Sequence, residues 1–344
     1  MKKHRAVLLW AVLLGGWVAV CACGPVHPPT LPPTETDHTA QLQAAINKAQ
    51  EEGPPIVRLE PGNYNISATL TTNGRVSFLC PSRSATLRWT GPDDGSYMLR
   101  ITGPGSASKI HGLSFDGQKK ASGIHATKFT YGNSIERCRF IDFVNGIHVL
   151  QSWGMNIKDC LFSTFSGYAI RLELHNGGSV SGCQFMWANG RELAAGAAVF
   201  QVYGTNGTYE RHYFECCSLP DGHPLARVSG HSKTYRDIYY ESTGGGKRQS
   251  DVMILVEGSH NKIQQISSWN KCALGDGIKH AVVVKGHDHL LEDIQVAGFR
   301  PDDPETAVIR IYGPDADSMR IIAVEDRSIE RGVTPAEQLI REEP

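Results

Sequence analysis

A short pattern of apolar and variable positions recurs along most of the chain. An apolar residue is followed three positions on by an apolar residue or cysteine, and two positions later by an aromatic or aliphatic residue. The clearest copies are Ile110/Leu113/Phe115, Ile135/Cys138/Phe140, Ile157/Cys160/Phe162 and Val180/Cys183/Phe185. Looser copies begin at Tyr209, Tyr235, Ile263, Leu291 and Met319. Successive copies start 22 to 29 residues apart, and a repeat of this length predicts a solenoid.

A second segment of alternating apolar and polar residues follows each copy, for example at 146–149, 169–172 and 282–284. In the later repeats this segment ends on a glycine, at Gly204, Gly230, Gly258, Gly286 and Gly313. Alternation with period two indicates short strands that have one face inside and one outside. We therefore predict an all-β fold, a right-handed parallel β-helix of roughly ten coils. A leucine-rich-repeat solenoid fits less well, because dense leucines and an asparagine ladder are missing.

The first residues have the pattern of an export signal. Lys2, Lys3 and Arg5 precede an apolar run to residue 22, which predicts a secretory signal peptide over 1–22, with a retained membrane anchor as the alternative. Residues 20–24 resemble a bacterial lipobox, which implies a lipid on Cys23 and attachment to a membrane through that anchor alone. The expected location is the outer membrane or cell surface as a lipoprotein, otherwise the periplasm or the medium.

The rest of the chain divides into a tether, one repeat domain and a closing segment. Residues 23–37 are rich in proline and predict an extended tether, 38–332 the β-helix domain, and 333–344 a C-terminal capping segment. A capping box at 334–337 predicts a short helix over 334–341. Near the N-terminus, Asp37 or Thr39 is the expected N-cap of a capping helix that ends before Gly53. Its apolar face is formed by Leu42, Ala45, Ile46 and Ala49.

This opening carries a family resemblance. Residues 44–49 followed by Val57, Leu59, Pro61-Gly62 and Tyr64 resemble the start of pectate-lyase-superfamily β-helix proteins of the pectate lyase 3-like type. In that family a short helix caps the first coil before a V-x-L-P-P-G-x-Y strand. The resemblance implies a protein that acts on polysaccharide. The N-T-D, G-H-G and R-I-K signatures of polygalacturonases and the V-W-I-D-H segment of pectate lyases are absent, and 275–280 matches only a fragment of them.

Charge and cysteine content exclude some classes of function. The chain has 34 basic and 35 acidic residues; without Lys2, Lys3 and Arg5 the balance is 31 against 35, or about −4, so we predict no nucleic-acid partner. Cysteines fill one slot of three consecutive repeats, where buried free thiols are favoured over disulfides. No spacing typical of zinc sites occurs, no cofactor is evident, and Ca²⁺ held by carboxylates is left open. The pattern says nothing about oligomeric state.

The candidate site is a column of outward residues in the second strand of each repeat: His125, His148, Arg171, Gln201, Arg227, Leu255, Val283 and Arg310. A polar stripe of this kind suits an extended polymer, although a solvated face is the plainer interpretation. For β-elimination or C5-epimerisation of a uronic acid, we assign Arg171 to neutralise the carboxylate and His148 to act as base or acid, with His125 as the third catalytic candidate. The candidate substrate-binding residues are Gln201, Arg227, Glu173, Tyr213 and Tyr239.

Glycoside hydrolysis fits this column poorly. It normally needs two carboxyl groups at a defined separation, and Glu173 has no acidic partner in the stripe. The sequence therefore predicts an extracytoplasmic lyase or epimerase acting on an anionic, uronate-containing glycan. The alternatives are a non-catalytic glycan-binding or adhesion scaffold and, beyond these, a glycoside hydrolase or phage-type depolymerase.

Overall fold

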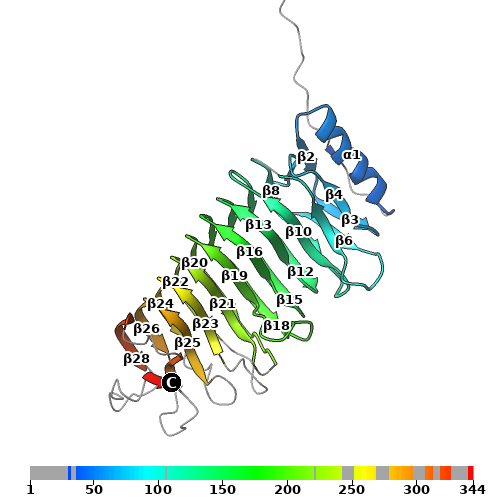
Figure 1. Ribbon diagram of the computed structural model, residues 1–344. Helices are drawn as coiled ribbons and strands as arrows, with labels where there is room; N and C mark the ends of the chain where they lie inside the picture. Colours follow the sequence, from blue (N-terminus) through cyan, green and yellow to red (C-terminus); the bar gives the residue numbers. More distant parts are fainter. Residues whose placement is uncertain are drawn as a thin grey trace, which may run out of the picture.

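The chain winds into a single right-handed parallel β-helix of about nine turns with one short helix at its N-terminal end (Figure 1). The computed structural model describes residues 30–31, 36–104, 107–220, 222–241, 252–268, 279–296, 307–312, 318–326 and 340–343. Neighbouring coils pair in parallel and in register, as β13 does with β10 and β16. The predicted fold class is confirmed, with about nine turns rather than ten.

One sheet, here called sheet B, contains the second strand of each repeat. It has eleven strands. They are β4 (Leu70–Thr72), β7 (Tyr97–Ile101), β10 (Ser122–Phe129), β13 (Ile147–Trp153), β16 (Ile170–Asn176), β19 (Phe200–Thr205), β21 (Pro224–His231), β23 (Val252–Ser259), β25 (His280–His287), β27 (Ala307–Tyr312) and β29 (Ile340–Glu343).

The other sheet, sheet A, has eighteen strands and wraps the rest of each coil. It bends where a residue adopts a left-handed backbone, as Asp159 (φ 53°) and Asp237 (φ 55°) do. Its strands are β1 (Thr30–Leu31), β2 (Ile56–Leu59), β3 (Gly62–Ile66), β5 (Ser77–Leu79), β6 (Ala85–Trp89), β8 (Lys109–His111), β9 (Leu113–Asp116), β11 (Ser134–Glu136), β12 (Arg139–Phe143), β14 (Asn156–Lys158), β15 (Leu161–Phe165), β17 (Ser179–Ser181), β18 (Gln184–Ala188), β20 (Thr208–Glu215), β22 (Thr234–Glu241), β24 (Lys262–Ser268), β26 (Leu290–Val296) and β28 (Arg320–Asp326).

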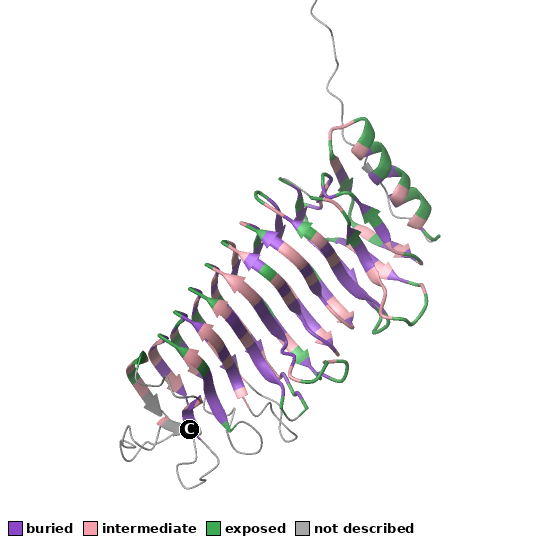
Figure 2. Ribbon diagram, in the orientation of Figure 1, coloured by how far each residue is buried: buried purple, intermediate pink, exposed green. Residues whose placement is uncertain are grey.

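The core is a continuous stack between the two sheets, seen as the buried stripes of Figure 2. The rings of Phe140 and Phe162 stack with centroids 4.8 Å apart, as strand spacing requires. Cys138, Cys160 and Cys183 are buried free thiols, and burial raises the pKa of Cys138 and Cys160 well above the usual value. The predicted inward slots are thus confirmed for the clear repeats.

The last looser repeat is the exception. Its expected lead residue was Met319, but Leu291 pairs with Ile321, and Ile294 pairs with Val324. The repeat therefore begins two residues later than predicted. The number of residues between the two strands does not determine where the repeat begins. The pairing of β28 with β26 does.

The capping helix α1 (Thr39–Glu51) closes the N-terminal end and buries the predicted face of Leu42, Ala45, Ile46 and Ala49. This closure shields an otherwise bare sheet edge. His38 is the N-cap residue rather than Asp37 or Thr39. Asp37 still contributes, because its Oδ1 accepts a hydrogen bond of 2.9 Å from the Thr39 N–H.

Both ends of the chain differ from the expected segments. Thr30–Leu31, within the predicted tether, pairs with β2. The helix expected over 334–341 is wrong at its end, because Ile340–Glu343 forms a strand that extends sheet B beside β27. Residues 1–22, Cys23, Gly313 and 334–339 lie outside the described residues, so the signal peptide and the lipid anchor stay predictions. In the described part of the chain, no helix has the length and hydropathy needed to span a membrane.

One inward slot of the core holds a histidine. His212 is 1% exposed and follows Cys183 in the slot that cysteines fill in the three preceding coils. Its ring lies 5.1 Å from that of Phe200, and among the described residues neither ring nitrogen has a hydrogen-bond partner. Burial lowers the pKa of His212 to about 3. This side chain therefore destabilises the coil.

Replacing His212 with isoleucine, which the next coil carries in this slot as Ile238, is expected to stabilise the fold by roughly 1–2 kcal/mol at pH 7. The unfolded imidazole takes up a proton near pH 6.5 and the folded one only near pH 3. The unfolded state thus binds more protons in between, so wild-type stability falls as the pH drops below 6.5. The gain should grow by about 1.4 kcal/mol per pH unit between pH 6 and 4. Urea unfolding of both proteins at pH 7 and pH 5 measures this gain in stability. If the stability of both proteins changes equally with pH, His212 is not the buried neutral imidazole that we infer.

Candidate functional site

A column of polar side chains crosses the outer face of sheet B. Strand register places Arg100, His125, His148, Arg171 and Gln201 beside one another on β7, β10, β13, β16 and β19. The residues on either side of each point inward, so the alternation predicted from the sequence is confirmed. Arg100 extends the predicted column by one coil.

His148 is the centre of a hydrogen-bonded cluster in this column. Its Nε2 lies 3.0 Å from Glu173 Oε1, and its Nδ1 lies 3.5 Å from the Tyr97 hydroxyl. A carboxylate only accepts hydrogen bonds, so Nε2 carries the proton and Nδ1 keeps its lone pair toward Tyr97. The Tyr97 hydroxyl is in turn hydrogen-bonded to that of Tyr168 at 2.6 Å. Glu173 therefore fixes the tautomer in which His148 is a base.

Charge is arranged unevenly around the cluster. Arg171 Nε forms an ion pair of 2.7 Å with Glu173 Oε1, although its N–H is not aligned as a hydrogen bond. The Arg171 guanidinium also lies 5.9 Å from the centre of the Tyr168 ring. Arg100 is exposed at the other end of the His125–His148 pair. Two arginines against one carboxylate leave an excess positive charge that favours an anionic ligand.

Burial sets the protonation states. It lowers the pKa of His148 below 6.5, and the hydrogen bond to Glu173 opposes that shift. Burial also lowers the pKa of His125, assisted by the neighbouring His148 and Arg100. Burial raises the pKa of Tyr97 and Tyr168. Near neutral pH the cluster thus combines a neutral imidazole base with protonated phenols, the pairing that general acid–base chemistry needs.

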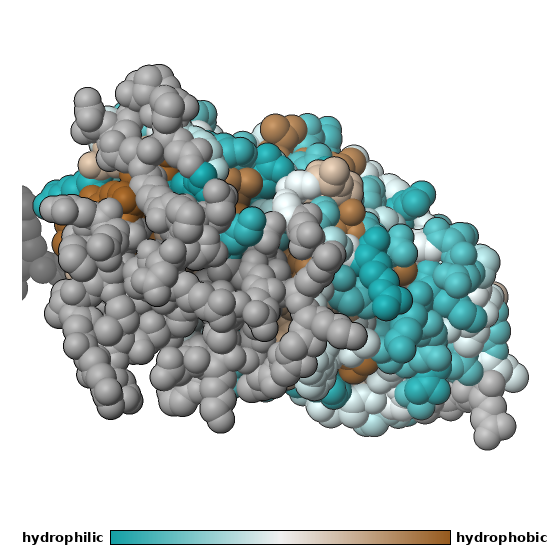
Figure 3. Space-filling view, turned by 90° about the horizontal axis from the view of Figure 1, so that it is seen from below, coloured by the Kyte–Doolittle hydropathy of each residue, from teal (hydrophilic) through white to brown (hydrophobic). Residues whose placement is uncertain are grey.

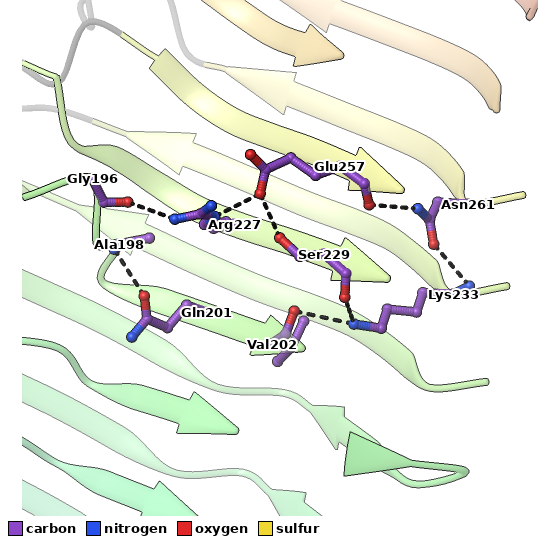
Figure 4. A network of polar contacts seen from close by, with 9 residues as sticks. All are labelled: Gly196, Ala198, Gln201, Val202, Arg227, Ser229, Lys233, Glu257 and Asn261. Carbon is purple, nitrogen blue, oxygen red and sulfur yellow. Dashed lines mark hydrogen bonds and ion pairs between the residues drawn. The ribbon is translucent and has the colours of Figure 1, made fainter. Parts of the chain in front are cut away.

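Two of the predicted binding residues, Gln201 and Arg227, form hydrogen bonds within the protein, in the network of Figure 4. Gln201 is 1% exposed, and its Oε1 accepts a hydrogen bond from the Ala198 N–H at 3.3 Å. Arg227 donates to Gly196 O at 3.1 Å and to Glu257 Oε2 at 2.7 Å. These contacts hold the loop before β19 against sheet B. Gln201, expected on the open stripe, is therefore covered.

The same network contains a fully buried lysine. Lys233 Nζ donates to Val202 O at 3.1 Å and to Ser229 O (Figure 4). Burial lowers the pKa of Lys233 to about 7. Its hydrogen-bond acceptors are carbonyl groups of two coils, so Lys233 joins neighbouring turns and does not face the site.

Tyr213 and Tyr239 form a separate feature. They lie on β20 and β22 of sheet A, with their rings stacked at 5.6 Å and inclined by 6°. The Tyr213 hydroxyl donates to Glu241 Oε2 at 2.8 Å, and burial together with Glu241 raises the pKa of Tyr213. The two tyrosines therefore do not share a surface with His148.

The site also contains residues that the sequence did not indicate. Tyr97 is the first residue of β7 and Tyr168 lies two residues before β16, and both contact the His148 ring. Arg100 did have a signal, because it occupies the outward slot of 98–101, one coil before the first predicted member. Metal ligands are not gathered here: in the ranges described, no group of three His, Cys, Asp or Glu residues is arranged to hold an ion.

The fold defines a right-handed parallel β-helix protein, and comparison with solved structures agrees. An alginate lyase from Paenibacillus sp. str. FPU-7 has a TM-score of 0.50 and 13% identity, covering 83% of this chain and 96% of that one. The A-module of the Azotobacter vinelandii mannuronan C-5 epimerase AlgE6 has a TM-score of 0.50 and 14% identity, covering 90% and 94%. The catalytic domain of a GH87 α-1,3-glucanase has a TM-score of 0.54 and 11% identity, covering 93% and 69%.

These neighbours are polysaccharide-active proteins by their descriptions, and at such identities the likeness is one of fold. The chain also matches Geobacillus virus E2 ORF18, of which it spans 58% of the length. No protein-family model and no curated protein matches the chain.

Proposed function

We propose that this protein binds an anionic, uronate-containing polysaccharide on the outer face of sheet B and cleaves it by β-elimination. The observation that supports this most directly is the His148 imidazole, which lies between the Glu173 carboxylate and the Tyr97 hydroxyl beside Arg171. Elimination requires a base for the C5 proton, an acid for the leaving O4 oxygen, and a cation against the C6 carboxylate.

The residues present fill these three roles. His148 Nδ1, unprotonated in the tautomer that Glu173 selects, accepts the C5 proton. Tyr97, whose pKa burial raises, keeps its proton and delivers it to O4 as the C4–O4 bond breaks. Arg171 pairs with the substrate carboxylate and stabilises the charge that develops when C5 loses its proton. The electrons of the C5–H bond form the C4–C5 double bond of the product.

The geometry also favours one stereochemistry. His148 Nδ1 and the Tyr97 hydroxyl are 3.5 Å apart, so the base and the acid approach the sugar from the same side. Such a pair suits syn elimination, in which C5–H and C4–O lie on one face of the ring, as in mannuronate and glucuronate. It does not suit galacturonate or guluronate, where the two bonds lie on opposite faces. Epimerisation is less favoured, because it needs proton donors and acceptors on both faces.

The test is the absorbance of the new C4–C5 double bond on polymers of mannuronate, glucuronate, guluronate and galacturonate. Arg171→Ala is expected to lower kcat/KM on the substrate by roughly 10–100-fold, because the carboxylate loses its counter-charge. Arg236→Ala is the matched control, since Arg236 is ion-paired with Glu210 at 2.7 Å on sheet A. Absence of unsaturated product from all four polymers would refute elimination; cleavage of galacturonan alone would refute the syn geometry.

A further inference from the structure

Large apolar side chains are rarely exposed among the residues that the structure describes. In the coloured part of the face drawn in Figure 3, hydrophobic residues form separate patches beside hydrophilic ones. In the described ranges the strongly exposed ones are Tyr131 at 72%, Trp153 at 41%, Leu174 at 58% and Trp187 at 51%. The first three belong to consecutive coils: Tyr131 follows β10, Trp153 is the last residue of β13, and Leu174 lies within β16; these strands lie side by side in Figure 1. We call Tyr131, Trp153 and Leu174 the apolar rim.

The aromatic part of the rim is seated on a glycine. A Cβ atom added at Gly154 would lie 2.5 Å from Cδ1 and 2.7 Å from Cε1 of Tyr131. The Tyr131 ring therefore rests on the bare backbone of the turn that follows Trp153. Gly154 also has a φ of +62°, which suits glycine. The ring thus contacts the protein along its Cδ1–Cε1 side and is otherwise largely exposed.

The aliphatic part of the rim sits on a bulge. Leu174 has a φ of 47°, which is unfavourable for leucine, and the register between β16 and β19 shifts between Leu172 and His175. The bulge turns an apolar side chain toward water, at a cost in both backbone conformation and solvation. Bulges of this kind often re-aim side chains beside functional sites. The preceding residue is Glu173, which holds His148.

We propose that the apolar rim is a sugar-stacking subsite for the glycan chain whose uronate unit is held at His148. This rests on the function proposed above. Pyranose rings present apolar C–H faces that pack on aromatic and aliphatic side chains. Trp153 lies on the same strand as His148, five residues further on, or about 16 Å at ~3.3 Å per residue. A short oligosaccharide spans that distance, so the cluster holds one unit while the rim holds another.

The rim fits a glycan better than a protein or membrane surface. It consists of three side chains, and its Tyr131 ring already contacts Gly154. Stacking a sugar on this ring therefore requires little further loss of side-chain conformational entropy. It is also continuous with a polar, positively charged cluster through Glu173 and Leu174. A partner that buries an extended apolar area would find no wider patch at these three coils.

The test measures binding in a His148→Gln background, where substrate is not turned over, using isothermal titration with oligomannuronates and oligoglucuronates of graded length. Trp153→Ala and Tyr131→Ala are each expected to weaken binding of the longer oligosaccharides by about 10-fold and to leave the shortest unchanged. Trp187→Ala is the matched control, an exposed tryptophan at the end of β18 on sheet A. Equal affinities for all four proteins would overturn the proposal.

Two further results separate this proposal from the one it rests on. If no uronate is bound, the same variants are tested against neutral glucan and xylan oligosaccharides. If Trp153→Ala alone weakens the binding of these neutral oligosaccharides, the stacking subsite is supported and the uronate function is refuted. If no glycan binds, both proposals are refuted. The third measurement is co-sedimentation with anionic phospholipid vesicles. If Trp153→Ala abolishes this co-sedimentation but leaves glycan affinity unchanged, the subsite proposal is overturned and the rim binds a membrane surface instead.

Discussion

Replacing His148 with glutamine is expected to lower kcat on the uronate polymer by roughly 10²–10⁴-fold, with a much smaller change in KM. Glutamine preserves the size of the side chain and a hydrogen bond to Glu173, but it offers no lone pair basic enough to accept the C5 proton. Unsaturated product measured under saturating polymer, together with thermal unfolding of both proteins, separates loss of the base from loss of the fold.

The pH profile adds a sharper readout. Because burial lowers the pKa of His148, wild-type activity should rise through an acid limb below pH 6.5 and then level off. Glu173→Gln removes the hydrogen bond that raises this pKa, so its acid limb should move to lower pH. The matched control is His260→Gln, an exposed histidine 3.5 Å from Asp288 at a distant turn. Full activity in His148→Gln, or an acid limb unmoved by Glu173→Gln, would assign the base elsewhere.

The fold could be predicted because the coils stack in register, so the same sequence positions are buried in each coil. Ile135, Ile157 and Val180 are equivalent inward positions, so any one of them indicates the others. The prediction failed where a local signal competes with pairing. The capping box favoured a helix to residue 341, but the exposed edge of β27 offers backbone hydrogen bonds to Ile340–Glu343. His212 was missed because no hydropathy pattern expects an imidazole in a buried slot.

The site was predictable only where its residues share the outward register position of sheet B. His125, His148 and Arg171 share a register position, and a register can be counted from the sequence. Tyr97 opens β7 but lies outside the outward column, and Tyr168 lies in the turn before β16, so counting the register finds neither. Gln201 has the right register but is covered by the loop before β19, whose path depends on Arg227 and Gly196. Periodicity thus identifies the column on sheet B, but it does not predict the tyrosines and the loop that surround the column.

Replacing Gly258 with alanine is expected to destabilise the protein by roughly 3 kcal/mol or more. Gly258 has a φ of +102° and pairs with Gly230 and Gly286 in neighbouring coils. A Cβ atom there would lie 2.9 Å from the carbonyl carbon of Gly230 and 3.1 Å from its Cα, and it would overlap the carbonyl oxygen. The obstacle is backbone, which cannot rotate away as a side chain does.

A control glycine without a close neighbour shows how much a left-handed backbone alone costs. Gly177 also has a positive φ, +62°, but a Cβ atom there would have no neighbour within 4 Å. Gly177→Ala should therefore carry only the backbone penalty of roughly 1 kcal/mol. Urea unfolding of both variants measures the difference, which combines the coil-to-coil contact with the less favourable φ of Gly258. Equal losses would mean that the coils can move apart at Gly258, so that the glycine column reflects local conformation and not the close approach of stacked turns.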